Sequence, residues 1–438
     1  MTTEELLKLC KKVLKDNDRG KHTVPASGFY PHQWLWDSCF IAIGLSHYNI
    51  KRAQQEILSL LKGQWSNGMI PNMILTPSSI PSQAEIFWRS DISPLSPDDV
   101  ATSGITQPPM LAEAVVSIGK KLPKNERLIW YQQVYPALLR YHTWLYKDRD
   151  PENCGLTLQV HPWETGLDNT PPWIYELKKH KIPFWIKLVG WLKLDYLIGF
   201  FRKDSFLALP GERISTLNAL SYYSIQRRLR RCRYETSQIL KHKELTIEDL
   251  SFNSIFIRAN FHLQKIAKAI NKKIPKELAE NIAKSESNLE EFWDAYTSQY
   301  YSRNHHNHKL IKVSSIGTLL PLYAGCITKE RAKQLVDILN NNQTFNTKYP
   351  VPTVPINSRW FDQHKYWQGP SWVNTNWLII DGLTRYGYTK EAQHIKQQTL
   401  KMVAGSGVSE YFSPLDASPA GANNFSWTAS LVIDLLNS

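Results

Sequence analysis

The segment from His161 to Trp173 reads HPWETGLDNTPPW, and the rest of the chain can be interpreted around it. It places two acids, Glu164 and Asp168, between two tryptophans and among three prolines. Each proline removes a backbone hydrogen-bond donor, and Gly166 can adopt dihedral angles that other residues avoid. The segment therefore predicts a rigid, irregular loop that presents carboxylates beside aromatic rings.

The same residues are also compatible with a purely structural turn. Thr170 could cap a helix whose first residue is Pro171, because proline is favoured at the first helical position. The segment alone does not choose between the two interpretations, so the other loops must.

Helical patterns dominate the rest of the chain, whereas strand-like alternation is scarce. No repeat of fixed period is present, which disfavours a regular solenoid. Roughly eleven to thirteen helices, joined by loops that alternate between short and long, predict an all-α fold of paired helices in a closed double ring. The expected helices include residues 4–15, 50–62, 110–118, 126–147, 184–201, 217–242, 247–272, 275–296, 329–341, 371–385, 389–403 and 426–437.

The domain organisation follows from what the sequence lacks. Length alone would permit several domains, but the 438 residues contain no Gly/Ser linker and no abrupt change in composition. We therefore expect one catalytic domain over residues 1–438. Long loops in compact domains are usually functional, so the stretches 76–106 and 161–215 are expected to be insertions that cover the site.

The net charge of +13 raises the question of a nucleic-acid partner. The densest basic run lies in a helical segment without the glycine and aromatic residues typical of RNA-binding motifs, and we interpret it as a solvated helix face. That run comprises Arg227, Arg228, Arg230, Arg231 and Arg233. No nucleic-acid partner is expected.

The five cysteines are odd in number and form no CxxC pair. This predicts a reducing, cytoplasmic compartment, without a disulfide framework or a zinc site. The tract RNHHNH, with His305, His306 and His308, resembles a metal-binding tract but lacks an acid partner at helical spacing. We expect no metal and no cofactor.

The N-terminal residues MTTEELLKLCKKVLK begin an amphipathic helix and lack the apolar core of a signal peptide. The most apolar stretch, Pro183 to Phe201, is interrupted by Lys187, Lys193 and Asp195. These charges favour a buried or partly buried helix over a membrane span, so no membrane partner is expected.

Three further loops share the aromatic and polar character of the first. They read GFYPHQWLWDSCF (28–40), YWQGPSWVNTNW (366–377) and SEYFSPLDASPAGANNFSW (409–427). Each leads into an apolar helix, so all four loops would meet at one mouth if the helices form a ring. This convergence favours the functional interpretation of the first segment.

The acids in these loops suit the hydrolysis of a glycosidic bond. That reaction needs a protonated carboxyl for the leaving oxygen and a carboxylate that attacks or activates water. Asp168, beside Trp163 and Trp173, fits the acid, because burial between apolar rings raises the pKa of a carboxyl. Glu410, in a more polar setting beside Tyr411, fits the base. The aromatic residues would supply flat faces for sugar rings.

The motifs HQWLWDSCFIAIGL, HPWETGLDN, YWQGPSWVNTNW and SEYFSPLDASPAGANNFSWTA resemble those of glycoside hydrolase family 63, on its bacterial mannosylglycerate and glucosylglycerate hydrolase branch. They occur in the family order and span nearly the whole chain. The resemblance implies an (α/α)6 barrel and inverting hydrolysis of α-glycosides, with Asp168 as the general acid and Glu410 as the general base. Inversion would place the two carboxyls about 6.5 to 9.5 Å apart.

The resemblance, together with the loop composition, also implies a set of substrate-binding residues. Glu164 belongs to this set as a residue that supports the loop or Trp163. The set comprises Tyr30, Trp34, Trp36, Asp37, Gln107, Trp163, Glu164, Arg213, Tyr366, Trp367, Gln368, Trp372 and Trp427.

Two positions depart from the family pattern. Residues 170–174 read TPPWI, where relatives tend to read SPRWD. In glycerate-specific relatives an Arg and a following Tyr are expected to hold the glycerate carboxylate, whereas here Arg213 is followed by Ala219 at the corresponding position. Arg213 could still pair with a carboxylate. The group attached to the sugar is therefore the least determined part of the substrate.

The sequence leaves more than one function open. The leading hypothesis is an α-glycosidase, which could form a homo-oligomer, that acts on a small charged glycoside such as glucosylglycerate or mannosylglycerate. A neutral α-glucoside or oligosaccharide is the alternative substrate if Arg213 lies away from the pocket. A noncatalytic carbohydrate- or nucleic-acid-binding protein is the alternative of another class. The presence of both acids argues against a noncatalytic carbohydrate-binding protein. The absence of a nucleic-acid-binding motif from the sequence argues against a nucleic-acid-binding protein.

Overall fold

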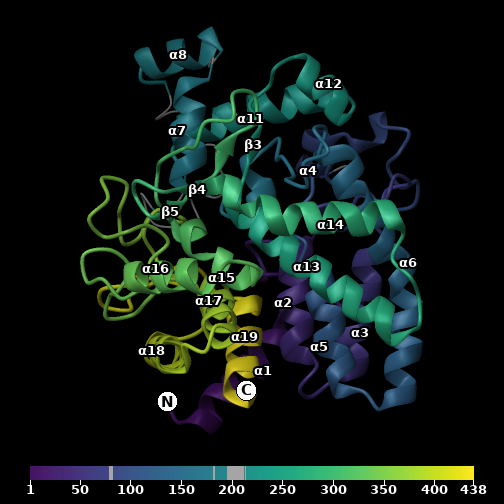
Figure 1. The fold of residues 1–438 in the computed structure, drawn as a ribbon, viewed down its shortest axis with the longest axis vertical. Helices are drawn as coiled ribbons and strands as arrows, with labels where there is room; N and C mark the ends of the chain where they lie inside the picture. The colour runs from purple at the N-terminus through teal and green to yellow at the C-terminus, as the bar shows by residue number, and fades with distance from the viewer. Residues whose placement is uncertain (78–81, 181–182, 195–211, 213) are drawn as a thin grey trace.

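The computed structural model describes residues 1–77, 82–180, 183–194, 212 and 214–438, and these residues form a helix-rich fold (Figure 1). The helices are α1 (Thr3–Asp16), α2 (Leu35–Leu45), α3 (Ile50–Leu61), α4 (Gln83–Trp88), α5 (Leu111–Lys121), α6 (Lys124–Arg149), α7 (Pro171–Lys179), α8 (Phe184–Trp191), α11 (Thr216–Arg231), α12 (Thr236–Lys241), α13 (Leu250–Ala269), α14 (Lys276–Asn288), α15 (Pro321–Ala324), α16 (Lys329–Leu339), α17 (Val373–Arg385), α18 (Thr389–Ser406) and α19 (Ser426–Asn437).

The strands are short and pair in four antiparallel two-stranded ladders. The pairs are β1 (Gln33–Trp34) with β2 (Met73–Ile74), β3 (Ile247–Glu248) with β6 (Arg303–Asn304), β4 (Trp293–Asp294) with β5 (Gln299–Tyr300), and β7 (Ser409–Phe412) with β8 (Pro419–Asn423). The ladders brace loops rather than build a layer of the core. Glu410 lies on β7, and β1 leads directly into α2.

Six helices pack on one another in succession: α2 on α5, then α13, α15, α17 and α19, and α19 again on α2. Each of the six also packs against at least one helix outside this succession, and these partners include, in the same order, α3, α6, α14, α16, α18 and α1. The contact between α19 and α2 is very close, because a Cβ at Gly44 would lie 2.2 Å from Oγ of Ser430. That hydroxyl donates a hydrogen bond of 2.8 Å to the carbonyl of Ile41.

The segment from His161 to Trp173 has features of both a rigid loop and a helix start. Residues 162–165 form a single 3-10 turn, which ends at Gly166 in the left-handed conformation with φ 69°. Pro171 then begins α7, with Thr170 at the N-cap but without a side-chain capping bond. The segment is therefore an irregular loop that also starts a helix.

Several expected helices differ in extent from the observed ones. The helix expected over 217–242 is divided into α11 and α12, because Arg233 and Tyr234 adopt φ angles of 51° and 62°. The stretch 76–106 is not entirely a surface loop. It contains α4, which begins with a capping box between Ser82 and Glu85 and ends at Trp88, whose exposed fraction is 2%.

The buried or partly buried helix expected over 184–201 is only slightly buried in its described part. Helix α8 covers residues 184–191, and most of its side chains are exposed. Residues 195–201 lie outside the described part of the chain. None of the described helices combines the length and the apolar character needed to cross a membrane.

Candidate active site

Residues from all four aromatic loops line one small inner cavity of about 50 Å³. Both predicted catalytic acids lie in its wall, although they are 242 positions apart in the chain. Ten residues of the predicted site line this cavity: Tyr30, Trp34, Trp36, Asp37, Gln107, Asp168, Tyr366, Trp367, Glu410 and Trp427. Pro25, Gly166 and Phe425 complete the wall and were not predicted.

A larger outer cavity of about 400 Å³ adjoins the inner one. The two cavities share the residues Tyr30, Trp34, Asp168 and Tyr366. Asp168 is therefore at the junction between the cavities, whereas Glu410 lines only the inner one. A proton donor at such a junction could reach a bond that joins a group in one cavity to a group in the other.

The side chain of Asp168 is half-buried and accepts a hydrogen bond of 3.2 Å from the Tyr366 hydroxyl. Its backbone carbonyl accepts a second bond, of 2.7 Å, from Tyr222. The turn that precedes it needs a glycine, because a Cβ at Gly166 would lie 2.6 Å from the ring of Trp36. Backbone geometry and two tyrosines thus fix the position of this acid.

Asn169 connects the loop of Asp168 to the loop that begins at Tyr366. Its Oδ1 accepts a hydrogen bond of 2.8 Å from the backbone N–H of Trp367. Its backbone carbonyl accepts one of 2.7 Å from Nε2 of Gln368. Asn169 therefore holds the two loops together beside the acid.

Glu410 is almost fully buried, with an exposed fraction of 1%. Its two carboxylate oxygens accept hydrogen bonds from the Tyr30 hydroxyl, at 2.9 Å, and from the backbone N–H of Ala422, at 2.8 Å. Strand β8 can approach this closely because residue 421 is a glycine with φ 72°. A Cβ there would lie 2.5 Å from Oε2 of Glu410.

Asp37 adds a third carboxyl to the inner cavity, in the first turn of α2. Burial raises its pKa well above the usual value, and the negative charges of Glu410 and Asp168 act in the same direction. A carboxyl of this kind is protonated over a wider pH range than an ordinary aspartate. It can therefore donate a hydrogen bond to a ligand.

Indole rings form most of the remaining wall. The ring of Trp36 meets that of Trp427 edge to face at 5.2 Å, and Trp367 stacks on Trp372 at 3.7 Å with an interplanar angle of 5°. Trp372 itself lines neither cavity and also stacks on Tyr411. It supports the wall from behind.

Four buried polar atoms of cavity-lining residues have no hydrogen-bond partner within the described part of the chain. They are Nε1 of Trp34, Trp367 and Trp427 and Oε1 of Gln107. Buried polar groups are normally hydrogen-bonded, and those without a partner call for an explanation. A ligand with several hydroxyl groups would supply the missing partners.

Glu164 lines neither cavity, although it belongs to the same loop as Asp168. Its carboxylate is fully buried and accepts bonds of 3.0 and 2.8 Å from the Arg149 guanidinium. The backbone N–H groups of Val160 and Thr106 also donate to it. These contacts give Glu164 a supporting role in holding the loop. Gln368, bonded to Asn169, likewise lines neither cavity.

The outer cavity contains residues that the sequence analysis missed. Trp163 was predicted. Most of the remaining wall comes from α4 and from side chains around β1 and β2, and Ile214 before α11 completes it: Phe29, Met73, Gln83, Ala84, Phe87, Trp88 and Ile214. The Phe87-Trp88 pair at the end of α4 was the available signal. It was overlooked because Ser, Pro and Asp dominate the surrounding stretch. Arg213, the predicted ligand of a carboxylate, lies outside the described residues.

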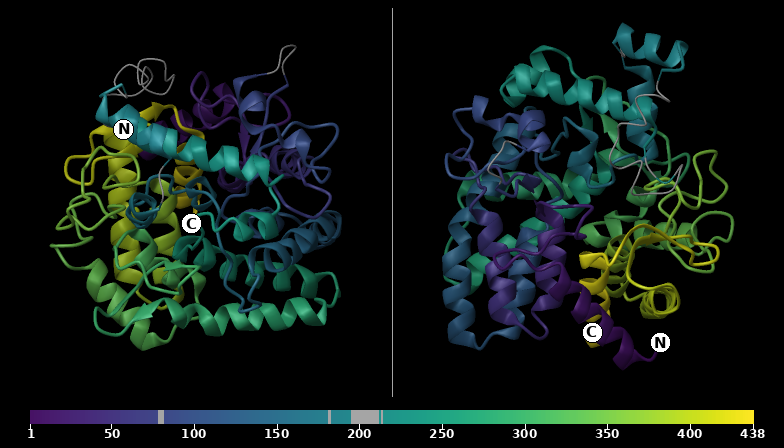
Figure 2. Two further views of the ribbon diagram at one scale, coloured as in Figure 1. Left: turned by 90° about the horizontal axis from the view of Figure 1, so that it is seen from above. Right: turned by 180° about the vertical axis from the view of Figure 1, so that it is seen from behind.

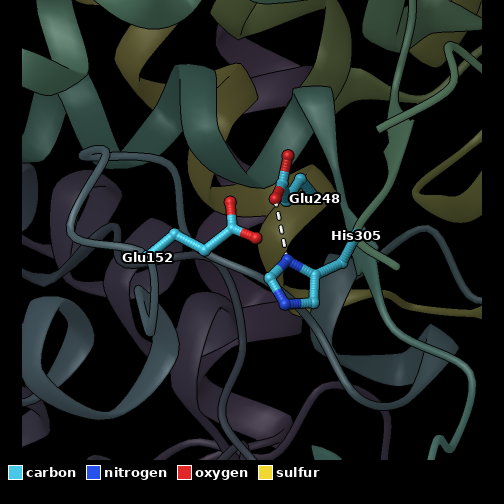
Figure 3. A group of neighbouring side chains, drawn as sticks. All are labelled: Glu152, Glu248 and His305. Carbon is cyan, nitrogen blue, oxygen red and sulfur yellow. Dashed lines mark hydrogen bonds and ion pairs between the residues drawn. The ribbon is translucent and has the colours of Figure 1, made fainter. Parts of the chain in front are cut away.

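One cluster among the described residues has the composition of a metal site: Glu152, Glu248 and His305 (Figure 3). Nδ1 of His305 lies 2.9 Å from Glu248, which also accepts a hydrogen bond from Arg303. The histidine thus has the acid partner that helical spacing did not reveal. The Arg303 guanidinium already balances the buried carboxylate, so this arrangement is an ion-pair cluster.

The chain is similar to known proteins over almost its whole length. Residues 30–428 match the family described as the mannosylglycerate hydrolase MGH1-like glycoside hydrolase domain. The mannosylglycerate hydrolase of Thermus thermophilus is 34% identical over 425 residues, which cover 96% of this chain and 98% of the relative. The glucosylglycerate hydrolase of Mycolicibacterium hassiacum is 28% identical over 99% of this chain and 98% of the relative.

A solved structure supports the same assignment. The crystal structure of a family 63 mannosylglycerate hydrolase from Thermus thermophilus, in complex with Tris and D-glycerate, superimposes with a TM-score of 0.87 at 33% identity. The match covers 99% of this chain and 100% of the other. The resemblance seen in the four sequence motifs is confirmed. The chain belongs to glycoside hydrolase family 63, in its mannosylglycerate hydrolase-like group, and is a glycoside hydrolase.

Proposed function

We propose that this enzyme hydrolyses a small α-glycoside of glycerate, mannosylglycerate or glucosylglycerate, with inversion at the anomeric carbon. The observation that carries the proposal is the position of the two acids. Asp168 and Glu410 face one inner cavity, and only Asp168 also faces the outer cavity. A glycosidic bond that crosses the junction would have its oxygen beside Asp168. The sugar carbon would then be on the side of Glu410.

The inner cavity is proposed to hold the sugar. The indole faces of Trp36, Trp367 and Trp427 would pack on the ring. The unpaired N–H groups of Trp34, Trp367 and Trp427 and the Gln107 side chain would bind its hydroxyls. Protonated Asp37 would donate a further hydrogen bond. These contacts would orient the anomeric carbon toward Glu410.

The reaction then needs one proton donor and one base. Asp168 gives its proton to the glycosidic oxygen as the bond to the anomeric carbon breaks. A water molecule attacks that carbon from the opposite face, and Glu410 takes the proton that the water loses. The hydroxyl of Tyr30 and the N–H of Ala422 hold the base in place. Direct displacement by water converts an α-glycoside into a β-sugar.

The outer cavity is proposed to receive the leaving group. The solved relative is in complex with D-glycerate, which would be the leaving group of such a substrate. Arg213 as the partner of the glycerate carboxylate remains a prediction. The described lining of the outer cavity supports a neutral glycoside as a second candidate. Apart from Gln83 and Asp168 this lining is mainly apolar, and its described part contains no lysine or arginine that could pair with a carboxylate.

We also propose that the six successive helices and their outer partners form an (α/α)6 double ring, which makes residues 1–438 one catalytic domain. The cyclic order of helix contacts supports this arrangement. The loops that carry the acids would then share one end of the ring. The five cysteines are free, which is compatible with the expected cytoplasmic location.

A substrate panel tests the proposal. Mannosylglycerate, glucosylglycerate, the corresponding glycerol glycosides and neutral disaccharides would be compared by kcat/KM, with proton NMR to follow the first product. We expect a glycerate glycoside to be preferred and the β-anomer to appear first. Initial α-anomer would contradict inversion, and a preference for neutral glycosides would support the second candidate.

Two variants test the acids within the same assay. Asp168→Asn and Glu410→Gln are each expected to lower kcat by about 10² to 10⁴. Asp99→Asn, at an exposed acid in the 76–106 stretch, is the matched control and should leave kcat unchanged. Folded variants with wild-type turnover at both acids would contradict the mechanism.

A further inference from the structure

Helix α8 projects beyond the body of the molecule, past α7 and α11, in Figure 1 and in the right-hand view of Figure 2. It rests on α11 through one narrow edge. Ile186 is buried, and a Cβ at Gly190 would lie 3.3 Å from the side chain of Leu217. Residues 186 and 190 are four positions apart and therefore share this inner face.

The opposite face of α8 is apolar and exposed. Phe184, Leu188 and Trp191 follow the spacing i, i+4, i+7 and so lie in one row, which we call the α8 stripe. Phe184 and Trp191 each have an exposed fraction of 78%. Trp185 and Leu192 beside the row are also exposed. An ordinary surface helix turns its apolar face to the core, whereas α8 also exposes a row of large apolar side chains to solvent.

Contiguous exposed apolar surface of this kind marks an interaction site. The charge around it indicates the partner. Residues 178–194 contain five lysines and no aspartate or glutamate. Lys187 and Lys193 are exposed beside the α8 stripe. Lysine is depleted at interfaces between proteins, whereas tryptophan, phenylalanine and leucine combined with lysine are typical of helices that lie in the surface of a membrane.

A second group of cations lies at the base of α8. Lys178 and Lys179, in the last turn of α7, line a surface hollow together with Arg359 and Trp360. Because Phe184 is five residues after Lys179, this hollow begins within about 18 Å of the α8 stripe. Glu176 pairs with Lys179 at 2.9 Å, so the base of α8 carries a net positive charge through Lys178 and Arg359.

We propose that α8 binds peripherally to an anionic lipid surface. Phe184, Leu188 and Trp191 enter the boundary between headgroups and acyl chains, and Lys187 and Lys193 pair with lipid phosphates. A helix of this length cannot span a bilayer, so the association is reversible and adds to the hydrolase a location at the membrane surface. This inference is independent of the substrate proposed above.

Cosedimentation of the full-length protein with vesicles tests the proposal. One set of vesicles is phosphatidylcholine alone, and the other contains phosphatidylglycerol as well. The protein is expected to bind the second set and to dissociate as the salt concentration rises, because salt screens surface charges. Binding that is equal for both sets would contradict the role of anionic lipid.

Variants separate the two contributions. Replacing all three residues of the α8 stripe by serine should weaken binding at least about tenfold, because three large apolar side chains no longer leave water. Lys187→Glu/Lys193→Glu should weaken it at least about tenfold through charge. Ile129→Ser/Tyr296→Ser is the matched control, since both residues are exposed, Ile129 on α6 and Tyr296 in the turn between β4 and β5. Circular dichroism and thermal unfolding check that each variant is folded.

The alternative partner is a second copy of the chain. Sedimentation velocity without vesicles measures it in the same samples. If the wild type forms a dimer that the serine variant abolishes, and neither vesicle set binds, the α8 stripe is an interface between copies and the proposal is wrong. Absence of vesicle binding without a dimer also overturns it.

Discussion

The ion pair between Arg149 and Glu164 supports a quantitative prediction about the catalytic loop. Both side chains are almost completely buried, with exposed fractions of 2% and 0%. Glu164→Gln keeps the shape of the side chain but leaves the Arg149 guanidinium without its buried counter-charge. Removing one partner of a buried pair typically costs about 3 to 5 kcal/mol. Asp148, 3.4 Å from Nε of Arg149, partly compensates, so we expect a loss of about 3 kcal/mol.

Equilibrium unfolding in urea would measure this loss as a change in the free energy of unfolding. The matched control is Asp337→Asn, which removes the exposed i,i+4 partner of Lys333 at 2.6 Å. An exposed pair of this kind is worth at most about 1 kcal/mol. The double variant Arg149→Met/Glu164→Gln should recover part of the stability lost by Glu164→Gln, because the unpaired charge is gone.

The kinetics of Glu164→Gln distinguish a role of Glu164 in supporting the loop from a role in binding the substrate. If Glu164 supports the loop, Glu164→Gln destabilises the protein and lowers kcat through the position of Asp168. A variant with unchanged unfolding free energy and a raised KM would refute this reasoning. It would place Glu164 in contact with the substrate instead.

Three further outcomes are expected. Gly421→Ala should lower kcat at least about tenfold, because its Cβ would collide with Glu410. The control Gly387→Ala, at φ 84° with open space around it, should cost only about 1 to 2 kcal/mol of stability. Equal kcat in both variants would contradict the steric argument. Tyr30→Phe should lower kcat about tenfold through the lost hydrogen bond to Glu410, and wild-type kcat would show that Ala422 alone positions the base. The raised pKa of Asp37 means that the folded protein holds this proton more tightly than the unfolded chain, so wild-type stability falls as the pH rises above about 4. Asp37→Asn should therefore be more stable than the wild type at neutral pH, with the difference vanishing at about pH 4 and below. If urea unfolding gave the wild type and Asp37→Asn equal stability between about pH 4 and neutral pH, the raised pKa of Asp37 would be contradicted.

Local patterns predicted the site better than its outer wall. The aromatic loops could be recognised because glycine, proline and paired aromatic residues interrupt helical periodicity, and their acids proved to share one cavity. Helix α4 was missed because a six-residue helix within a stretch rich in serine and proline gives too short an apolar repeat. Phe87 and Trp88 become part of the site only when the fold brings α4 over Asp168.

The sequence by itself determined the family, the helix-rich class and the identity of the two candidate acids. Only the tertiary structure supplied the physical reason why Glu164 supports the loop while Asp168 lines the cavities, although the two acids lie four residues apart. Arg149 is fifteen positions before Glu164 and captures that carboxylate in the core, while Asp168 remains at the junction of two cavities. It also showed that α8, expected to be buried or partly buried, exposes a row of large apolar side chains to solvent. The periodicity of a segment states which side chains share a face, but the neighbours that cover that face are set by contacts between segments far apart in the chain.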